Sequence, residues 1–282
     1  MMLVLKANPD PYGRFGHQTC NQLASFLLAN ITGSYFSPER YQFISHKFNS
    51  IINWESLRNA HTHPISKRYY IEDFLPDHTQ KETISSIVVL KTYVDALNLI
   101  AAESPGEGYA LVELPFGLLT GVLDNLIPMY QAQLKKIYIA QNQYPASRVS
   151  IHLRRGDASK ANRLLVNEEF QREKILYILE KYIPSHLPIH ILTQETNPEK
   201  LRFLRDYTNE RQIYLHLERG DFMTNTSDVD HFNFMANSSH LILGKSAFSK
   251  TAALLGKCNK VFDLEDEDTN TRNLSRLGII RV

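Results

Sequence analysis

Two arginines stand beside a histidine and an aspartate in the segment His-Leu-Arg-Arg-Gly-Asp, residues 152–157. A guanidinium can bind two phosphate oxygens at once and keeps its charge at neutral pH. Because burying such cations without an anionic partner is unfavourable, we predict that the segment binds an anion, and our hypothesis is a diphosphate. One alternative is that His152 is a hydrogen-bonded core histidine. A second is that Arg154 and Arg155 pair with Asp157 or with another carboxylate.

A second candidate for anion binding is the segment Leu-Ile-Leu-Gly-Lys-Ser-Ala-Phe-Ser-Lys, residues 241–250. We expect a buried strand that runs through Gly244 into a helix with Ser246 at or near its N-cap. Backbone amides at a helix start, together with the helix dipole, favour a bound anion. A P-loop is excluded, because the position five residues before Gly244 is Ser239 and not glycine. The alternative for Ser246 and Ser249 is plain helix capping.

The segment Gly-Arg-Phe-Gly-His-Gln, residues 13–18, could also approach a ligand closely. Its two glycines allow a tight backbone at the start of a predicted helix, and Arg14 and His17 add hydrogen-bond donors. Its glycines lack the spacing of the dinucleotide-binding fingerprint. The alternative is a tight loop with a surface arginine.

Acidic residues give little support for a metal site. Asp228 and Asp230 have the Asp-x-Asp spacing with which metal-dependent sugar-nucleotide enzymes hold a divalent cation. They precede a predicted helix, so N-capping explains them as well. We expect the acidic run 265–268 to be a solvated loop. Because arginines are available to neutralise a diphosphate, we expect no metal.

Residues 216–221, His-Leu-Glu-Arg-Gly-Asp, repeat the segment 152–157 at all but one position. Both segments end predicted strands, so the second could face the same crevice. The interpretation that we favour is coincidence, or an Arg–Asp turn without a ligand.

The second half of the chain alternates apolar strands with amphipathic helices, which is typical of a parallel sheet with helices on both faces. Its expected strands are 149–154, 189–193, 213–217, 241–243 and 261–263, and its expected helices are 175–183, 198–207, 231–239 and 247–255. Open α/β sheets bind their ligands at the carboxyl ends of the strands, where we expect residues 152–157 and 244–249 to lie.

The first half follows an α/β pattern less regularly. We expect strands at 2–7, 87–90 and 109–114, helices at 20–31 and 92–102, and a helical stretch at 118–141 that Pro128 kinks or interrupts. The region from 35 to 80 is rich in aromatic residues and histidines, among them Trp54, His61 and His63. They could form a carbohydrate acceptor surface, but the interpretation that we favour is packing of an irregular region.

The composition is that of an ordinary globular protein, with 43% hydrophobic and 22% charged residues. A length of 282 residues suits two domains, which we place at 1–145 and 146–282. The net charge of +1 disfavours a nucleic-acid partner. Cys20 and Cys258 provide neither a disulfide framework nor a metal-ligand spacing. With no transmembrane run and no signal peptide, we expect a soluble, cytoplasmic protein and leave peripheral membrane association open.

Together these segments resemble the fucosyltransferases that use GDP-fucose, most closely the α1,2 group, with similarities to the α1,6 and protein O-fucosyltransferases. Residues 152–157 resemble their most distinctive motif, His-x-Arg-Arg-Gly-Asp, and residues 13–18 resemble their Gly-Arg-(Phe or Leu)-Gly-Asn-Gln loop. Residues 234–235, 240–243 and 246–249 resemble their third region, in which a helix and a strand lead to Ser-Ser-Phe-Ser.

The resemblance implies a GT-B fold of two facing Rossmann-like domains, the first on the acceptor side and the second binding the GDP-sugar. It implies transfer of fucose with inversion to a glycan or glycoconjugate, without a metal or another cofactor. Our candidate catalytic residues are Arg154, Asp157, His17 and Arg14. The implied donor-binding residues are Gly16, His152, Arg155, Ser246, Ala247, Phe248 and Ser249. Among them, Arg154 would bind the GDP phosphates and Arg14 would lie beside the reaction centre.

The chain departs from the family pattern at several positions. His17 stands where the family has Asn, Lys250 and Thr251 replace a Trp-Trp pair, and His231 takes the place of an Asp. Two alternatives to a fucosyltransferase therefore stay open. One is a non-catalytic protein that binds a nucleotide sugar or a glycan at a degenerate site, and the other is a related transferase that uses another sugar nucleotide. His17 and Asp157 are the candidates for the general base.

Overall fold

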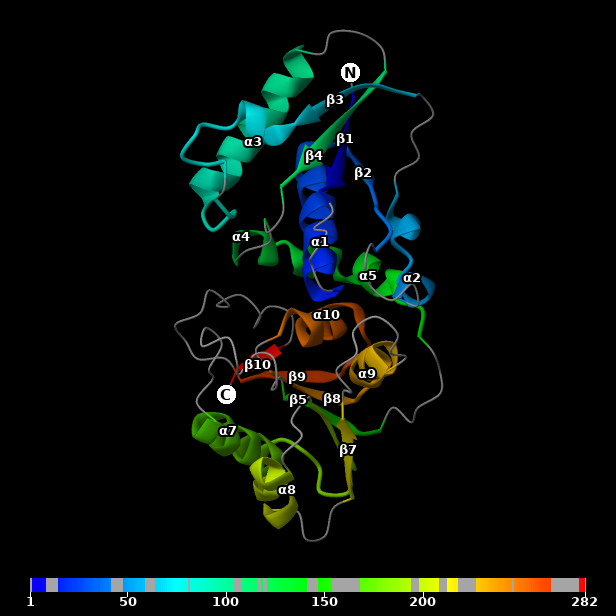
Figure 1. Ribbon diagram of the computed structural model, residues 1–282, viewed down its shortest axis with the longest axis vertical. Coiled ribbons are helices and arrows are strands. Elements are labelled where there is room, and N and C mark those ends of the chain that lie inside the picture. The colour runs from blue at the N-terminus through cyan, green and yellow to red at the C-terminus, as the bar shows by residue number, and fades with distance from the viewer. Residues whose placement is uncertain are drawn as a thin grey trace. The chain divides into compact units, whose positions relative to one another are not determined.

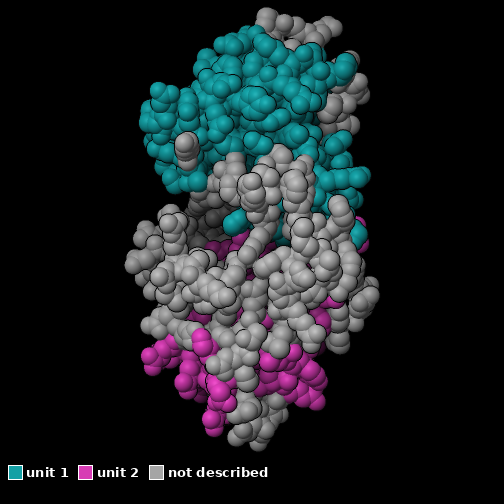
Figure 2. Space-filling model, viewed as in Figure 1, with its two compact units in different colours: residues 1–137 teal, residues 138–282 magenta. Residues whose placement is uncertain are grey.

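A computed structural model shows two compact units, residues 1–137 and 138–282, coloured separately in Figure 2. The sequence placed the division between residues 145 and 146. The residues that the structure describes are 2–8, 15–41, 48–58, 64–80, 82–103, 108–115, 118, 121–140, 147–153, 168–193, 198–207, 212–217, 227–244, 246–264 and 279–281.

The first unit is built on a four-stranded sheet with the strand order β2-β1-β4-β3, in which every pair is parallel (Figure 1). Its strands are β1 (Met2–Ala7), β2 (Tyr35–Ser37), β3 (Ile65–Tyr70) and β4 (Tyr109–Leu114). Its helices are α1 (Phe15–Thr32), α2 (Phe48–Ile51), η1 (Trp54–Leu57), η2 (Ile71–Phe74), α3 (Ile87–Glu103), α4 (Gly121–Asp124) and α5 (Ile127–Ile137). The central strands β1 and β4 are nearly continuous buried apolar runs, as both faces of a parallel sheet require.

The strand predicted at residues 87–90 is wrong, because these residues form the first turn of α3. The buried side chains of α3 recur with helical spacing and are Val89, Tyr93, Ala96, Leu97 and Ile100. A four-residue apolar run does not distinguish a strand from a helix, and here the longer helical pattern decides. Pro128 interrupts the stretch 118–141 as predicted, since it is the second residue of α5, where a missing N–H breaks no helical bond.

The second unit contains a six-stranded parallel sheet with the order β10-β9-β8-β5-β6-β7. Its strands are β5 (Val149–Leu153), β6 (Ile189–Thr193), β7 (Ile213–Leu217), β8 (His240–Leu243), β9 (Lys260–Asp263) and β10 (Ile279–Arg281). Its helices are α7 (Glu168–Lys181), η3 (Pro198–Leu201), α8 (Arg202–Tyr207), α9 (Ser227–Ala236) and α10 (Ala247–Leu255). The five strands that the sequence predicted are confirmed to within a residue, and β10 is additional.

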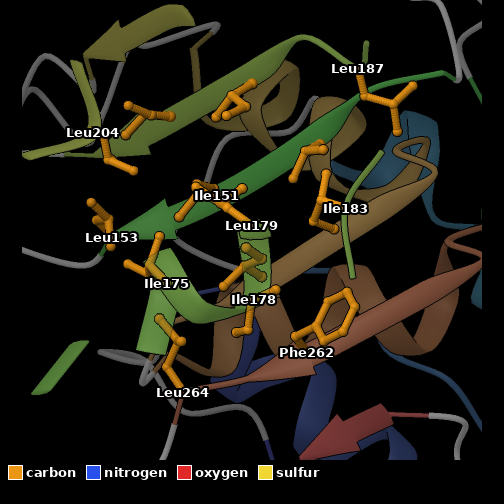
Figure 3. Close-up of a cluster of buried hydrophobic side chains, with 14 of the residues drawn as sticks. Ile151, Leu153, Ile175, Ile178, Leu179, Ile183, Leu187, Leu204, Phe262 and Leu264 are labelled. Carbon is orange, nitrogen blue, oxygen red and sulfur yellow. The ribbon is translucent and has the colours of Figure 1, made fainter. Parts of the chain in front are cut away.

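The largest described core of the second unit lies between its sheet and α7. Ile151 and Leu153 on β5 point toward Ile175 and Leu179 on α7 (Figure 3), and all four side chains are fully buried. Burying an aliphatic side chain of this size contributes roughly 1.5–3 kcal/mol. This packing holds β5 at the centre of the sheet.

The strand order of the second unit is that of dinucleotide-binding folds. From β5 the chain adds β6 and β7 on one side, and it then returns to add β8, β9 and β10 on the other side. The order reverses between β5 and β8, and ligands of such sheets bind at the carboxyl ends of the strands at that point. The predicted α/β class, with two Rossmann-like units built on parallel sheets, is confirmed.

Candidate functional site

The two segments predicted to bind an anion leave the second sheet from neighbouring strands. β5 ends at Leu153, so Arg154 follows it directly in the sequence, and β8 ends at Leu243, just before α10. The two strands pair in parallel, with Ile151 beside Ile242. Four predicted site residues lie outside the described residues: Arg14, Arg154, Arg155 and Asp157. The described part of the site therefore consists of the strand that precedes the arginines and the helix that starts beside it.

His152 joins these two elements. Its imidazole is buried, and the centre of the ring lies 6.0 Å from the centre of the Phe248 ring at an angle of 56°. Residues predicted from two separate segments thus contact each other at the point where the strand order reverses.

The start of α10 is shaped by its own serines. Ser246 is the N-cap, and its hydroxyl accepts a hydrogen bond of 3.2 Å from the Phe248 N–H. Ser249 is fully buried, and its hydroxyl donates to the carbonyls of Gly244 at 3.3 Å and Ser246 at 3.2 Å. The capping interpretation of Ser246 is confirmed. Contact of Ser246 and Ser249 with a sugar-nucleotide substrate stays a prediction. Ala247 and Phe248 are half-buried at this positive end of the helix dipole.

Phe232 of helix α9, an aromatic residue that sequence reasoning missed, packs against Phe248. The Phe232 ring is fully buried, 5.9 Å from Phe248 and 5.7 Å from Tyr138 between ring centres. The Tyr138 hydroxyl donates to Asn233 Oδ1 at 2.7 Å and accepts from Asn237 Nδ2 at 2.7 Å. Burial raises the pKa of the Tyr138 phenol, so the hydroxyl stays protonated and keeps this donor role. A contact chain therefore connects Tyr138 to His152.

Arg148 is a further residue that sequence reasoning missed, and it binds the carboxyl-terminal end of α9. This fully buried arginine precedes β5, and its guanidinium donates to the Phe234 carbonyl at 2.7 Å and lies 4.7 Å from the centre of the Phe234 ring. A cation in this place is favourable, because the last turn of a helix carries partial negative charge. The Arg148 carbonyl in turn accepts from the Ser239 hydroxyl at 2.7 Å and from the His240 N–H at 3.2 Å. The residue fastens α9 to the starts of β5 and β8.

In the first unit, α1 begins at the third predicted segment. Phe15 is buried and stacks on Phe48 with 3.9 Å between ring centres. The Thr19 hydroxyl donates to the Phe15 carbonyl at 2.8 Å and lies 3.0 Å from the Tyr41 hydroxyl. Gly16 is buried and His17 is exposed. These contacts fix the first turn of α1, where the sequence predicted two site residues.

Trp54 belongs to the same network, since its indole N–H donates to the Tyr41 hydroxyl at 2.8 Å. Its side chain is buried, so the packing interpretation is confirmed for this residue and an exposed acceptor platform at Trp54 is wrong. His61 and His63 lie outside the described residues.

Asp228 and Asp230 lie inside the first turn of α9 and not before it, because the helix begins at Ser227. Acidic side chains there interact favourably with the helix dipole, and residues two apart do not face the same side. Within the described ranges, no group of three or more His, Cys, Asp or Glu side chains could hold a metal ion. Of the repeated segment 216–221, the first two residues end β7 and the rest lie outside the described residues, as does the run 265–268.

Among the helices described, none has both the length and the apolar character that crossing a membrane requires.

A scan against protein-family models and a search of curated proteins find no match. Among solved structures, the chain is similar to the fucosyltransferase NodZ from Bradyrhizobium. The selenomethionine form of NodZ is 11% identical, with a TM-score of 0.42 over 90% of this chain and 92% of that chain. A second NodZ structure is 12% identical, with a TM-score of 0.41 over 90% of this chain and 93% of that chain. Similarity of this degree concerns the fold alone.

Proposed function

We propose that the chain is an inverting, metal-independent glycosyltransferase that transfers fucose from GDP-fucose to a glycan or glycoconjugate acceptor. One observation carries this proposal. At the reversal of strand order between β5 and β8, the segment with Arg154 follows one strand, the capped helix α10 follows the other, and His152 contacts Phe248 between them. The choice of GDP-fucose rests on the resemblance of residues 152–157, 13–18 and 246–249 to the fucosyltransferase motifs.

In this proposal the acceptor hydroxyl attacks the anomeric carbon while the bond from that carbon to the GDP oxygen breaks. Arg154 offsets the charge that develops on the departing diphosphate, and Arg155 and the start of α10 assist it. His17 or Asp157 accepts the proton of the acceptor hydroxyl. Because guanidinium groups neutralise the diphosphate, the proposed reaction needs no metal.

Replacing Arg154 tests the electrostatic part of the proposal. We expect Arg154→Ala to lower the turnover of GDP-fucose by about 10²–10³-fold, the range seen when one transition-state donor is removed. Arg172→Ala is the matched control, because Arg172 is an exposed arginine of the same unit whose guanidinium lies over Phe203. Turnover at the wild-type rate in Arg154→Ala would exclude the proposed role.

A binding panel separates the remaining alternatives. GDP-, UDP- and CMP-sugars are titrated calorimetrically without metal, and slow hydrolysis of the bound donor is then followed. Binding of GDP-sugar with hydrolysis supports the transferase. Binding without turnover toward any acceptor favours a non-catalytic protein that binds a nucleotide sugar at a degenerate site, an alternative that the departures from the family pattern at His17 and Lys250 support. A preference for UDP-sugars rules out fucose as the transferred sugar.

A further inference from the structure

Among the described residues the two sheets have four edge strands, and these strands differ in the features that protect them from pairing with another chain. An edge strand presents unpaired backbone groups that can pair with another chain, and proteins oppose this with short edges, charged side chains or proline. β2 and β10 are only three residues long, and β3 carries Lys67 and Arg68. β7 is a five-residue run, Ile-Tyr-Leu-His-Leu, without a Lys, Arg, Asp, Glu or Pro. Within the part of the chain that the structure describes, β7 therefore lacks the protection of the other three edges.

β7 also exposes large apolar side chains on both faces. Tyr214 is 45% exposed and Leu215 is 44% exposed. The Tyr214 ring is held in place, because it stacks on His190 with 4.7 Å between ring centres and its hydroxyl donates to Gln212 Oε1 at 3.0 Å. On the opposite face, Ile213 packs against the buried core, and Leu215 continues this apolar surface toward solvent.

The register of β7 determines which backbone groups point outward. The Ile189 N–H donates to the Gln212 carbonyl at 2.9 Å, and Ile189 is the register partner of Ile213. Successive residues of a strand direct their backbone groups to opposite sides, so Gln212 and Tyr214 face β6. The backbone groups of positions 213, 215 and 217 then face away from the sheet, with Leu215 at the centre.

We propose that β7 pairs antiparallel with β7 of a second copy of this chain, about a two-fold axis at Leu215. In this register Leu215 exchanges both of its backbone hydrogen bonds with its own symmetry mate, and position 213 does so with position 217. The two Leu215 side chains are directly opposite and on the same face, where they cover each other. A second copy fits for two reasons. The outward backbone groups of positions 213, 215 and 217 are placed symmetrically about Leu215, and the five residues of β7 carry no charged side chain that would repel its copy.

The proposed interface is small. A stable interface buries about 1,200–2,000 Å², which is more than a pair of five-residue strands provides. The dimer is therefore reversible and concentration-dependent. It joins the two C-terminal sheets into one continuous sheet, and three strands, β7, β6 and β5, lie between the axis and the β5–β8 reversal of each copy.

Sedimentation velocity of the full chain at about 1–100 µM, the range of weak dimers, tests the proposal. We expect a monomer–dimer equilibrium, together with slower hydrogen exchange of the Leu215 amide at the high concentration. Leu215→Lys adds a charge to the edge and is expected to raise the dissociation constant at least about tenfold. Leu215→Pro removes an outward N–H that the ladder with β6 does not use, and it is expected to have the same effect.

Leu99→Lys is the matched control, because Leu99 is 55% exposed on α3 in the other unit, and we expect it to dimerise like the wild type. Circular dichroism establishes that each variant is folded, and either folded Leu215 variant is sufficient for the test. The proposal is overturned by a wild type that stays monomeric over the whole range, by dimers that a folded Leu215 variant retains, or by Leu215 exchange independent of concentration. Growth into open assemblies would equally contradict a closed two-fold pair.

Discussion

His240 is a buried imidazole at the first position of β8, with its Nδ1 2.9 Å from the Ser239 hydroxyl. Burial, and secondarily the charge of Lys260, lowers the pKa of His240 below its ordinary value of 6.5. The folded chain therefore binds a proton here less readily than the unfolded chain does. The resulting stability is complete above pH 6.5 and is lost as the pH falls through the lowered pKa.

At the residue scale this predicts an acid-sensitive fold. The free energy of unfolding should decrease between pH 7 and pH 5, and His240→Gln should reduce the steepness of that decrease. Urea titrations at several pH values measure both slopes. His186→Gln is the control, since His186 is an exposed histidine of the same unit. An unchanged slope in His240→Gln would show that other groups cause the acid sensitivity.

Phe248 of the candidate site belongs to α10, which packs against α9. Gly256, directly after α10, allows the two helices to approach closely. A Cβ atom at Gly256 would lie 2.4 Å from the Ala236 carbonyl oxygen and 2.5 Å from the Ala252 carbonyl oxygen. Both atoms belong to the backbone, so neither can turn aside. The Lys257 N–H donates to the same Ala236 carbonyl at 2.7 Å, which ties the end of α10 to the end of α9.

At the element scale we therefore predict that Gly256→Ala is destabilising despite its small size. Overpacking of this kind typically lowers the free energy of unfolding by about 1–3 kcal/mol. Denaturant unfolding of the purified chain measures the loss. Lys257→Ala, at the exposed neighbouring position, should change stability by less than about 0.5 kcal/mol. Equal stability of the two variants would contradict the close packing of the two helices.

On the scale of the whole molecule, the chain passes from one unit to the other at two adjacent residues that are each held firmly. The Ile137 carbonyl accepts the Asn53 N–H at 2.7 Å within the first unit. Tyr138 is buried in the second unit, where its hydroxyl bonds to Asn233 and Asn237 on and just after α9. Each of the two residues is therefore fixed within its own unit.

We predict that Tyr138→Phe weakens the attachment of this residue within the second unit. Loss of the hydroxyl leaves the buried amide of Asn233 and the half-buried amide of Asn237 each without one partner, which lowers the free energy of unfolding by about 1–3 kcal/mol. Thermal unfolding measures the effect, and faster hydrogen exchange should appear in α9. Tyr70→Phe, at an exposed tyrosine, should leave both readouts unchanged. Wild-type stability in Tyr138→Phe would mean that these hydrogen bonds contribute nothing to that attachment.

The sequence by itself determined most elements of the second unit. Its five strands are short apolar runs bounded by turn residues, and this pattern can be recognised locally without knowing which elements pack together. The same local rules predicted Ser246 as a helix cap. They failed at residues 87–90, where a short apolar run fits a strand and a helix equally well. They also left β2 and β3 unassigned within an aromatic region whose Trp54 proved to be core.

Only the tertiary structure decided which strands are neighbours, since pairing depends on residues far apart in the chain. The reversal between β5 and β8, the contact of His152 with Phe248 and the support of that contact by Phe232 all follow from this pairing. The unprotected edge at β7 is a consequence of the same strand order, because a strand is an edge only by virtue of what pairs beside it.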